Sequence, residues 1–470
     1  MTRFTLPDDL YSYQREDAKR MSDGGQNWLN FSEMGVGKTP EAIQTIEDGG
    51  YLVPLIVCPN SLRLEWKRQI GEWVGDDMTA ISHPDSYKKL DALVYSFVKK
   101  WKKYRIINYE TFRTPRFLEL LTQMPFDIIV FDEIHKLRNP KTKQVKGVWE
   151  FLNALPNARI IGLSGSPIMN YPNDLYVPLS CVDPEKFPRD MQAYRLFMYR
   201  YCYWTDGQYG AYIQGTRNMG ELKERTAPYV IRRTKKEVLP FLPEKTYTRT
   251  LLEMKDDQRK LYEEMENHLR VLLDTGEPLY STNVLSTLTR LRQINLDPKI
   301  VGISASSAKT EYILDVVDST DEKLVIFSCF EKYIYWLQLL FEKQGKKVAV
   351  VSGEVPPDKR LERVKQFQED DSVQLFLGTI HTAGEGLTLT SAASGILADR
   401  WWNHPVNQQA EDRLHRIGQK NKVQIMIPLC ADSVDESLDL ILERKYMATE
   451  GYYQEGAVRQ AIMEARGIKR

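Results

Sequence analysis

The chain has 470 residues, of which 42% are hydrophobic and 27% charged, and these proportions exclude an intrinsically disordered protein. Because one hydrophobic core usually stops growing well below this length, we expect at least two domains. The 64 Lys and Arg residues balance 64 Asp and Glu, so the net charge of zero gives no sign of an anionic partner.

Five scattered cysteines lack the spacing of metal ligands and are odd in number, which predicts reduced thiols. The first residues show no secretory signal, and no apolar run approaches the roughly 18 residues of a membrane span. We therefore expect a protein that is neither secreted nor membrane-bound. We expect it to lie in the cytoplasm or to be associated with the nucleoid. If the source is viral, the expected compartment is the cytoplasm of the host cell.

Short apolar runs recur along the chain, and most are followed by a helical pattern. This alternation predicts an α/β fold with parallel sheets and helical crossovers. The runs form two series, at 28–31, 52–58, 105–108, 127–131 and 159–163, and then at 323–328, 347–351, 373–377, 395–398 and 423–429. Two series predict two lobes, over about residues 1–240 and 241–470.

Residues 184–296 have a helical, charged and aromatic pattern instead. We interpret them as helical insertions, on the first lobe from about residue 184 and on the second up to about residue 300. The aromatic group around Tyr201 is interpreted as the core of an insertion rather than a platform for nucleic-acid bases.

A glycine-containing loop follows the first predicted strand in NWLNFSEMGVGKT and leads into the helical pattern EAIQTI. Strand, loop and helix in this order form a site where backbone N–H groups bind phosphates. Lys38 is expected to contact the terminal phosphates of ATP, and Thr39 to ligate Mg²⁺. Ser32 stands where the usual motif has its first glycine. The ATP-binding candidates in the loop are Met34, Gly35, Val36, Gly37, Lys38 and Thr39.

Two carboxylates end an apolar strand in FDIIVFDEIH. Asp132 and Glu133 stand where the chain leaves a buried sheet, an edge that faces the ligand crevice in α/β proteins. Asp132 is placed to hold Mg²⁺ through water, and Glu133 to orient the attacking water. His135 is a candidate for sensing this geometry. An acidic helix cap is the alternative for this segment alone.

Three further segments accompany these motifs: YSYQRED around Gln14, GLSGSPIMN at 162–170 and QQAEDRLHRIGQ at 408–419. Together they resemble the SWI/SNF-like helicase-related ATPases of superfamily 2. The resemblance covers about residues 13–444, and its last segment is highly specific. It implies two RecA-like lobes, ATP and Mg²⁺ as cofactors, double-stranded or forked DNA as partner and a monomeric motor.

The resemblance also implies roles for single residues. Gln14 would read the adenine edge, and the DEIH segment would be the DEAH-type box. Gly386 would contact ATP, and Gln409 would take part in catalysis. The residues that would couple nucleotide state to DNA binding are His135, Ser164, Gly165 and Ser166.

Arg413 and Arg416 stand three positions apart, so that on a helix both guanidinium groups can share a face. Such arginines stabilise charge on a transferring phosphoryl group, which contributes roughly 10³–10⁵ in rate. We expect both to be catalytic. A surface pair on an ordinary helix is the alternative.

A motor that advances over any sequence should contact mainly phosphates. Hydroxyl and amide side chains near strand ends suit this role. The candidates are Ser61, Asn108, Thr379 and Thr382. Two basic clusters are either additional DNA contacts or solvated faces: Lys99, Lys100, Lys102 and Lys103, and Arg232, Arg233, Lys235 and Lys236.

The segment TAGEGLTLTSA, at 382–392, is spaced more like the fork-remodelling or annealing branch than like nucleosome remodellers. The first functional hypothesis is therefore a double-stranded DNA translocase that remodels or anneals DNA or displaces bound proteins. A strand-separating DNA or RNA helicase is the alternative enzyme. A binding module whose ATPase has decayed is the alternative class, disfavoured by the intact motif residues.

Overall fold

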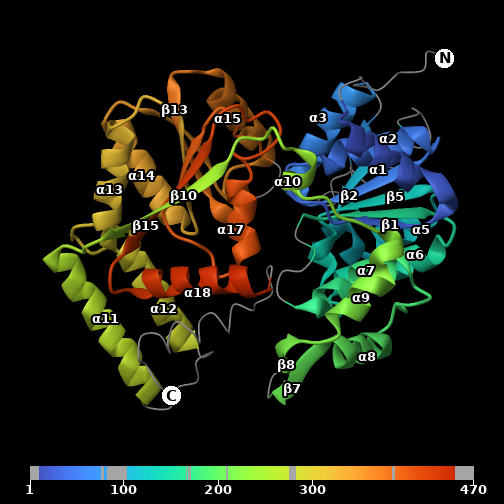
Figure 1. Cartoon of the computed structure of the whole chain (residues 1–470), viewed down its shortest axis with the longest axis horizontal. Helices are drawn as coiled ribbons and strands as arrows, with labels where there is room; N and C mark the ends of the chain where they lie inside the picture. Colours follow the sequence, from blue (N-terminus) through green and yellow to red (C-terminus); the bar gives the residue numbers. More distant parts are fainter. Residues whose placement is uncertain are drawn as a thin grey trace. The chain divides into compact units, whose positions relative to one another are not determined.

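The computed structural model describes residues 10–75, 79–81, 103–165, 167, 171–207, 210–274, 282–383 and 387–449. The chain forms two compact units, Met1–Pro240 and Phe241–Arg470. Each unit is built around its own parallel sheet with helices packed on it (Figure 1). The predicted fold class, α/β with parallel sheets in two lobes, is confirmed.

The first unit contains a seven-stranded sheet in the order β3-β4-β2-β5-β6-β1-β9, and every described pair in it is parallel. Every residue of its interior strand β2 is buried. Such strands are covered on both faces, which is why they read as continuous apolar runs in the sequence. The strands are β1 (Trp28–Asn30), β2 (Pro54–Cys58), β3 (Thr79–Ile81), β4 (Tyr104–Asn108), β5 (Ile128–Asp132), β6 (Arg159–Leu163) and β9 (Val230–Ile231).

Helices cover both faces of this sheet. Figure 1 shows α2 and α3 on one side and α6 and α7 on the other. The helices of the unit are α1 (Ser12–Ser22), α2 (Lys38–Asp48), α3 (Arg63–Trp73), α5 (Pro115–Thr122), α6 (Lys143–Ala154), α7 (Tyr176–Val182), α8 (Met191–Tyr201), α9 (Met219–Thr226) and α10 (Lys235–Val238).

The register of three adjacent strands aligns the segments that carry the sequence motifs. Leu163 at the end of β6 pairs with Asn30 at the end of β1 and with Asp132 at the end of β5. Because the three strands are parallel, their carboxyl ends meet at one edge of the sheet. The phosphate-loop, DEIH and GLSGS segments therefore all leave the sheet at this edge.

The second unit contains a six-stranded sheet in the order β10-β15-β14-β11-β13-β12. Its strands are β10 (Lys245–Leu252), β11 (Leu324–Ser328), β12 (Lys347–Val351), β13 (Val373–Thr379), β14 (Ser394–Leu397) and β15 (Val423–Cys430). Its helices are α11 (Asp256–Asp274), α12 (Thr282–Leu296), α13 (Ala308–Asp318), α14 (Glu331–Lys343), α15 (Pro357–Glu369), α16 (Ile380–Ala383), α17 (His404–Glu411) and α18 (Val434–Thr449). Separate apolar clusters pack on its faces and among α11, α12 and α18.

The expectation that residues 184–296 are helical is wrong in part. This stretch supplies α8, α9, α11 and α12, but also the sheet strands β9 and β10 and an antiparallel hairpin, β7 (Cys202–Gly207) with β8 (Gly210–Thr216). Strand β10 is an edge strand whose residues are half-buried or exposed, so it lacks the apolar run of a central strand. Tyr201 is buried in the core, as predicted, but its neighbours Tyr199 and Tyr203 are 66% and 56% exposed, so the expectation that this aromatic group forms a core is confirmed only in part.

All five cysteines lie in the described part of the chain and form no disulfide, and four of them are buried. None of the helices described has the length and apolar character needed to cross a bilayer.

Candidate active site

The phosphate-binding motif forms the expected strand, loop and helix. The loop runs from the end of β1 to Gly37, and α2 begins at Lys38. Gly35 and Gly37 adopt left-handed backbone angles, with φ of 80° and 90°, which a residue with a side chain rarely tolerates. The Lys38 ammonium donates to the carbonyl oxygens of Ser32 and Glu33, at 2.8 and 2.9 Å. Thr39 lies in the first turn of α2, while Met34 and Val36 are buried.

Position 32 has serine where the usual motif has glycine, and the serine side chain forms a hydrogen bond within the fold. Its hydroxyl accepts a hydrogen bond from the Arg233 backbone N–H at 3.1 Å, and its own N–H donates to the Asn30 side chain at 3.1 Å. The serine therefore ties the loop to the chain that follows β9. Glycine at this position would lose that hydrogen bond.

Helix α1 packs directly against the loop. The Tyr13 hydroxyl and the Gln14 amide both donate to the Val36 carbonyl oxygen, at 2.6 and 2.9 Å. A β-carbon at Gly37 would overlap the Gln14 amide, which gives a second reason for glycine there. Gln14 is thus placed beside the loop, and its contact with adenine stays a prediction.

The DEIH segment begins at the end of β5. The Asp132 carboxylate accepts hydrogen bonds from the Trp66 indole at 2.8 Å and from the Glu133 N–H at 3.0 Å. Burial raises the pKa of Asp132 and the neighbouring Glu133 raises it further, while Trp66 and Lys38 oppose the rise. The Tyr109 hydroxyl donates to the Asp132 backbone oxygen at 2.7 Å. Trp66 and Tyr109 are contacts that the sequence analysis missed, although both lie in segments following strands.

Glu133, His135 and Ser164 form a connected group. His135 Nδ1 lies 3.1 Å from a Glu133 carboxylate oxygen and 2.9 Å from the Ser164 hydroxyl. Glu133 has a φ of 52°, a strained conformation for a residue with a side chain. The group joins the ends of β5 and β6, so three of the predicted residues are in direct contact.

The loop and the DEIH segment also meet electrostatically. Burial lowers the pKa of Lys38, and the negative charges of Glu133, Glu41 and Asp132 counter this effect. These carboxylates therefore lie near the ammonium group. A lysine, a helix N-terminus and the DEIH carboxylates thus lie together at one edge of the sheet. This arrangement suits a nucleoside triphosphate with its cation.

The predicted Mg²⁺ ligands fit that ion chemically. Thr39 offers a hydroxyl and Asp132 a carboxylate, and Mg²⁺ prefers oxygen ligands and usually binds through one or two carboxylates plus substrate phosphates. Among the described residues, no group of three or more His, Cys, Asp and Glu side chains could hold a metal ion by itself. Thr39 and Asp132 are therefore candidates to hold Mg²⁺ together with the phosphates of a nucleotide.

A buried polar network behind the loop was missed by the sequence analysis. The Asn30 amide donates to Glu41 at 2.6 Å, and the Arg233 guanidinium binds both oxygens of Asp17, at 2.7 and 3.0 Å. Glu41 and Asp17 are fully buried. Burial, and then the charge of Asp17, raises the pKa of Glu41 to about 8. The network fixes α1, β1 and α2 around the loop.

The GLSGS segment touches the loop at Gly165. A β-carbon there would overlap the Met34 side chain. Glycine is thus required at position 165, because the GLSGS segment passes close to the phosphate-binding loop. The resemblance assigns the first segment to coupling nucleotide state to DNA binding and the second to ATP binding. Ser166 lies outside the described residues.

The predicted DNA-contacting residues lie where strands end, two in each unit. Asn108 ends β4 and accepts a hydrogen bond from the Thr111 hydroxyl at 2.8 Å, and Ser61 lies in a turn after β2. In the second unit, Thr379 ends β13 and pairs with Ser328, while Thr382 lies in α16. Their contact with DNA stays a prediction.

The predicted arginine helix is wrong, although the two side chains do converge. Helix α17 ends at Glu411, and Arg413 and Arg416 follow it in turns. The helix end is held by Lys245, whose ammonium binds Glu411 at 3.0 Å and Asp412 at 3.3 Å. Both guanidinium groups donate to the Leu387 carbonyl oxygen, Arg413 at 3.5 Å and Arg416 at 3.3 Å.

Gln409 lies in α17, half-buried, and among the described residues its side-chain nitrogen has no hydrogen-bond partner. Gly386 lies outside the described residues. The first basic cluster also lies outside them except for Lys103, which binds Glu47 at 2.7 Å. In the second cluster, Arg233 is engaged with Asp17 and Lys235 is buried, which leaves Arg232 and Lys236 exposed.

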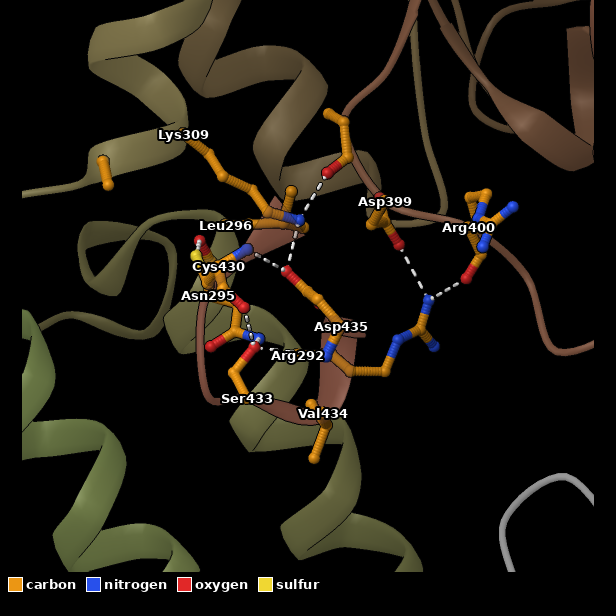
Figure 2. Close-up of polar contacts among 12 residues, drawn as sticks. Arg292, Asn295, Leu296, Lys309, Asp399, Arg400, Cys430, Ser433, Val434 and Asp435 are labelled. Atoms are coloured by element: carbon orange, nitrogen blue, oxygen red, sulfur yellow. Dashed lines mark hydrogen bonds and ion pairs between the residues drawn. The ribbon is translucent and has the colours of Figure 1, made fainter. Parts of the chain in front are cut away.

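A buried charge network supports the loop that leads into α17. Figure 2 shows Arg292 reaching the Asp399 carboxylate and the Arg400 carbonyl oxygen, at 2.8 and 2.7 Å. Beside it, the Lys309 ammonium lies 2.6 Å from Asp435 and 2.8 Å from the Ala398 oxygen. The network therefore fixes α12, α13, the end of β14 and the start of α18.

Comparison with protein families gives two matches. The SNF2-related domain matches residues 13–300, and the helicase conserved C-terminal domain matches residues 308–418. This chain belongs to the SNF2-related family. The family assignment agrees with the predicted SWI/SNF-like resemblance.

Individual SNF2-related relatives are distant. An uncharacterized ATP-dependent helicase of Mycoplasma pneumoniae is 27% identical over 445 residues, covering 91% of this chain and 40% of the relative. The human DNA annealing helicase and endonuclease ZRANB3 is 26% identical over 435 residues, covering 89% of this chain and 38% of the relative. The chain thus spans less than half of either protein. The Sulfolobus solfataricus SWI2/SNF2 ATPase core in complex with double-stranded DNA aligns over 100% of this chain and 98% of that structure, with 24% identity and a TM-score of 0.43.

Proposed function

We propose that the chain is a DNA-dependent ATPase that moves along double-stranded DNA and uses ATP hydrolysis to remodel or anneal DNA or to displace bound proteins. The observation that carries the proposal is the group at one edge of the first sheet, where the carboxylates of Asp132 and Glu133 act electrostatically on the Lys38 ammonium at the start of α2. Membership of the SNF2-related family supports the same activity.

The proposed chemistry assigns separate tasks to these side chains. Lys38 and the loop N–H groups bind the phosphates, and Thr39 and Asp132 would hold the Mg²⁺ ion, which neutralises phosphate charge. Glu133 orients the attacking water. Since His135 contacts both Glu133 and Ser164, a change at the phosphates can reach the GLSGS segment through two polar contacts.

Double-stranded DNA is the proposed substrate because of where the candidate contacts lie. Asn108 ends β4, and Ser61 lies in the turn that follows the adjacent parallel strand β2, so both lie at the sheet edge of the proposed catalytic segments. Short polar groups at strand ends suit phosphate contacts, which carry no sequence information. The similarity to an annealing helicase supports a duplex substrate.

The proposal is tested by the steady-state ATPase rate measured with single-stranded DNA, duplex DNA, forked DNA and RNA at equal nucleotide concentration. We expect duplex or forked DNA to stimulate hydrolysis well above the other two. Equal or stronger stimulation by single-stranded DNA would favour a strand-separating helicase, and stimulation by RNA alone would refute a DNA motor.

A further inference from the structure

A cavity of about 680 Å³ lies within the insertion of the first unit, away from the nucleotide site. It is lined by α8, by the loop before it, by the chain that follows β8 and by α9, and Figure 1 shows α8 and the β7–β8 hairpin at the end of the unit farthest from its sheet. This volume is within the range of roughly 300–1,000 Å³ typical of ligand pockets. No step of the proposed ATPase uses this cavity.

The walls of the cavity combine exposed apolar surface with positive charge. Leu196 is 65% exposed and Tyr199 66%, although both lie on a helix that packs into the core. The charged lining consists of four cations and one carboxylate: Lys186, Arg200, Arg217, Arg225 and Glu221. An apolar hollow with an excess of cations suits a ligand that carries both an apolar group and negative charge.

The positive charges differ in how far they are neutralised. Glu221 pairs with Arg200 at 2.7 Å and with Arg225 at 3.7 Å, and Lys186 pairs with Asp183 at 3.1 Å. Arg217 instead lies over two tyrosine rings, 5.0 Å from the centre of Tyr199 and 5.4 Å from that of Tyr203. Its buried Nε has no hydrogen-bond partner among the described residues. A guanidinium held against aromatic rings presents a rigid pair of donors that matches a carboxylate.

We propose that this cavity docks an acidic segment of a partner protein, with an apolar side chain seated against Leu196 and a carboxylate bound by Arg217. A protein segment fits better than nucleic acid for two reasons. Arg217 covers one face of each exposed tyrosine ring, which removes stacking surface for bases, and the cations surround one hollow instead of forming a track along a backbone.

The probe is a short fluorescent peptide of alternating aspartate and leucine, and its binding to the full chain is measured by fluorescence anisotropy at low and high salt. Two control peptides carry asparagine in place of aspartate or serine in place of leucine. We expect the first peptide to bind more weakly as salt rises, and both controls to bind at least about tenfold more weakly than it does.

Two substitutions test the residues. Arg217→Ala should weaken peptide binding at least about tenfold, because the carboxylate loses its charged partner. Leu196→Glu, on an exposed helix face, tests the same site without touching the core. The matched controls, Leu339→Glu on an exposed position of α14 and Arg195→Ala outside the cavity, should bind as the wild type does.

ATP hydrolysis with duplex DNA should stay unchanged in all four variants, since none touches the nucleotide site. Unchanged peptide affinity in both Arg217→Ala and Leu196→Glu would overturn the proposal. The proposal would also be overturned if an oligothymidine of equal charge displaced the peptide and bound Arg217→Ala more weakly than the wild type. The cavity would then be a nucleic-acid site.

Discussion

At the scale of single residues, the sequence predicted which side chains gather at the nucleotide site but not what holds them. Lys38, Asp132 and Glu133 could be predicted because short motifs fix their place relative to a strand end. Trp66 and Arg233 could not, because their contacts to Asp132 and Asp17 join positions far apart in the chain. Such pairings depend on the order of strands in the sheet, which local patterns do not encode.

The first prediction separates nucleotide binding from hydrolysis. Lys38→Ala should abolish ATP binding because the phosphates lose their charged partner. Glu133→Gln should keep ATP binding but lower turnover roughly a hundredfold or more, because only water activation is lost. Nucleotide affinity and steady-state ATPase rate, measured for both variants, test the difference. Near-normal turnover in Glu133→Gln would remove Glu133 from the catalytic role.

The second prediction concerns the buried carboxylate behind the loop. Burial raises the pKa of Glu41 to about 8, so the folded protein keeps a proton that the unfolded chain has lost. The contribution of Glu41 to the free energy of unfolding is complete below the usual glutamate pKa. It is lost as pH rises through about 8, by at most about 1.4 kcal/mol per pH unit.

Glu41→Gln should therefore flatten the fall in the free energy of unfolding between about pH 5 and 8, as measured by urea denaturation. Glu150→Gln on the exposed face of α6 is the matched control and should keep the wild-type slope. Parallel pH profiles for the wild type and Glu41→Gln would mean that Glu41 is ionised in the folded protein.

At the scale of elements, the strands predicted from continuous apolar runs are all present, because a buried parallel strand needs such a run. The errors lie at elements whose structure depends on tertiary contacts. Strand β10 was missed because an edge strand needs no continuous apolar run. The arginine helix was wrong because the chain after Glu411 bonds to a distant segment: the Arg413 carbonyl oxygen accepts a hydrogen bond from the Leu389 N–H at 2.9 Å.

The turn that follows α17 carries the third prediction. The charged and metal-mediated contacts to the phosphates are assigned to Lys38 and Thr39 of the first unit, so Arg416→Ala should leave ATP affinity nearly intact. Hydrolysis should fall by roughly 10³, because the lost contact forms mainly in the transition state. Stimulation by duplex DNA should disappear as well, while DNA still binds.

The readouts are ATP affinity, DNA affinity and turnover with and without duplex. Arg290→Ala, an exposed arginine of α12, is the matched control. Strong stimulation of Arg416→Ala by DNA would make Arg416 a structural residue that holds the Leu387 carbonyl, with Arg413 the next catalytic candidate.

The fourth prediction concerns the network that joins α13 to α18 (Figure 2). Lys309 is 1% exposed and binds Asp435 at 2.6 Å. Lys309→Met should destabilise the second unit by about 3–5 kcal/mol, because it leaves a buried carboxylate without its partner. The double variant Lys309→Met/Asp435→Asn should recover part of this loss.

Urea denaturation of the two single variants and the double variant forms a double-mutant cycle that isolates the pair. Lys359→Met removes one partner of an exposed ion pair with Glu362 and should change stability by less than about 1 kcal/mol. Equal losses of stability in Lys309→Met and Lys359→Met would show that the buried ion pair contributes no more to stability than the exposed one.

At the scale of the whole molecule, the composition predicted two domains, and the structure has two compact units, each with its own sheet. The motifs divide between them: the phosphate loop and the DEIH segment lie in the first unit, and Arg413 and Arg416 in the second. We therefore expect turnover to need both units, since neither carries the full set of motifs.

The central claim is movement along intact duplex DNA, and displacement of a third strand tests it most directly. A duplex that carries a short triplex-forming oligonucleotide is incubated with the protein, Mg²⁺ and ATP, with Glu133→Gln as the control for hydrolysis. We predict ATP-dependent release of the third strand while the duplex strands stay paired, and no release by Glu133→Gln. Separation of the duplex strands, or a third strand that stays bound although ATP is hydrolysed, would contradict the account.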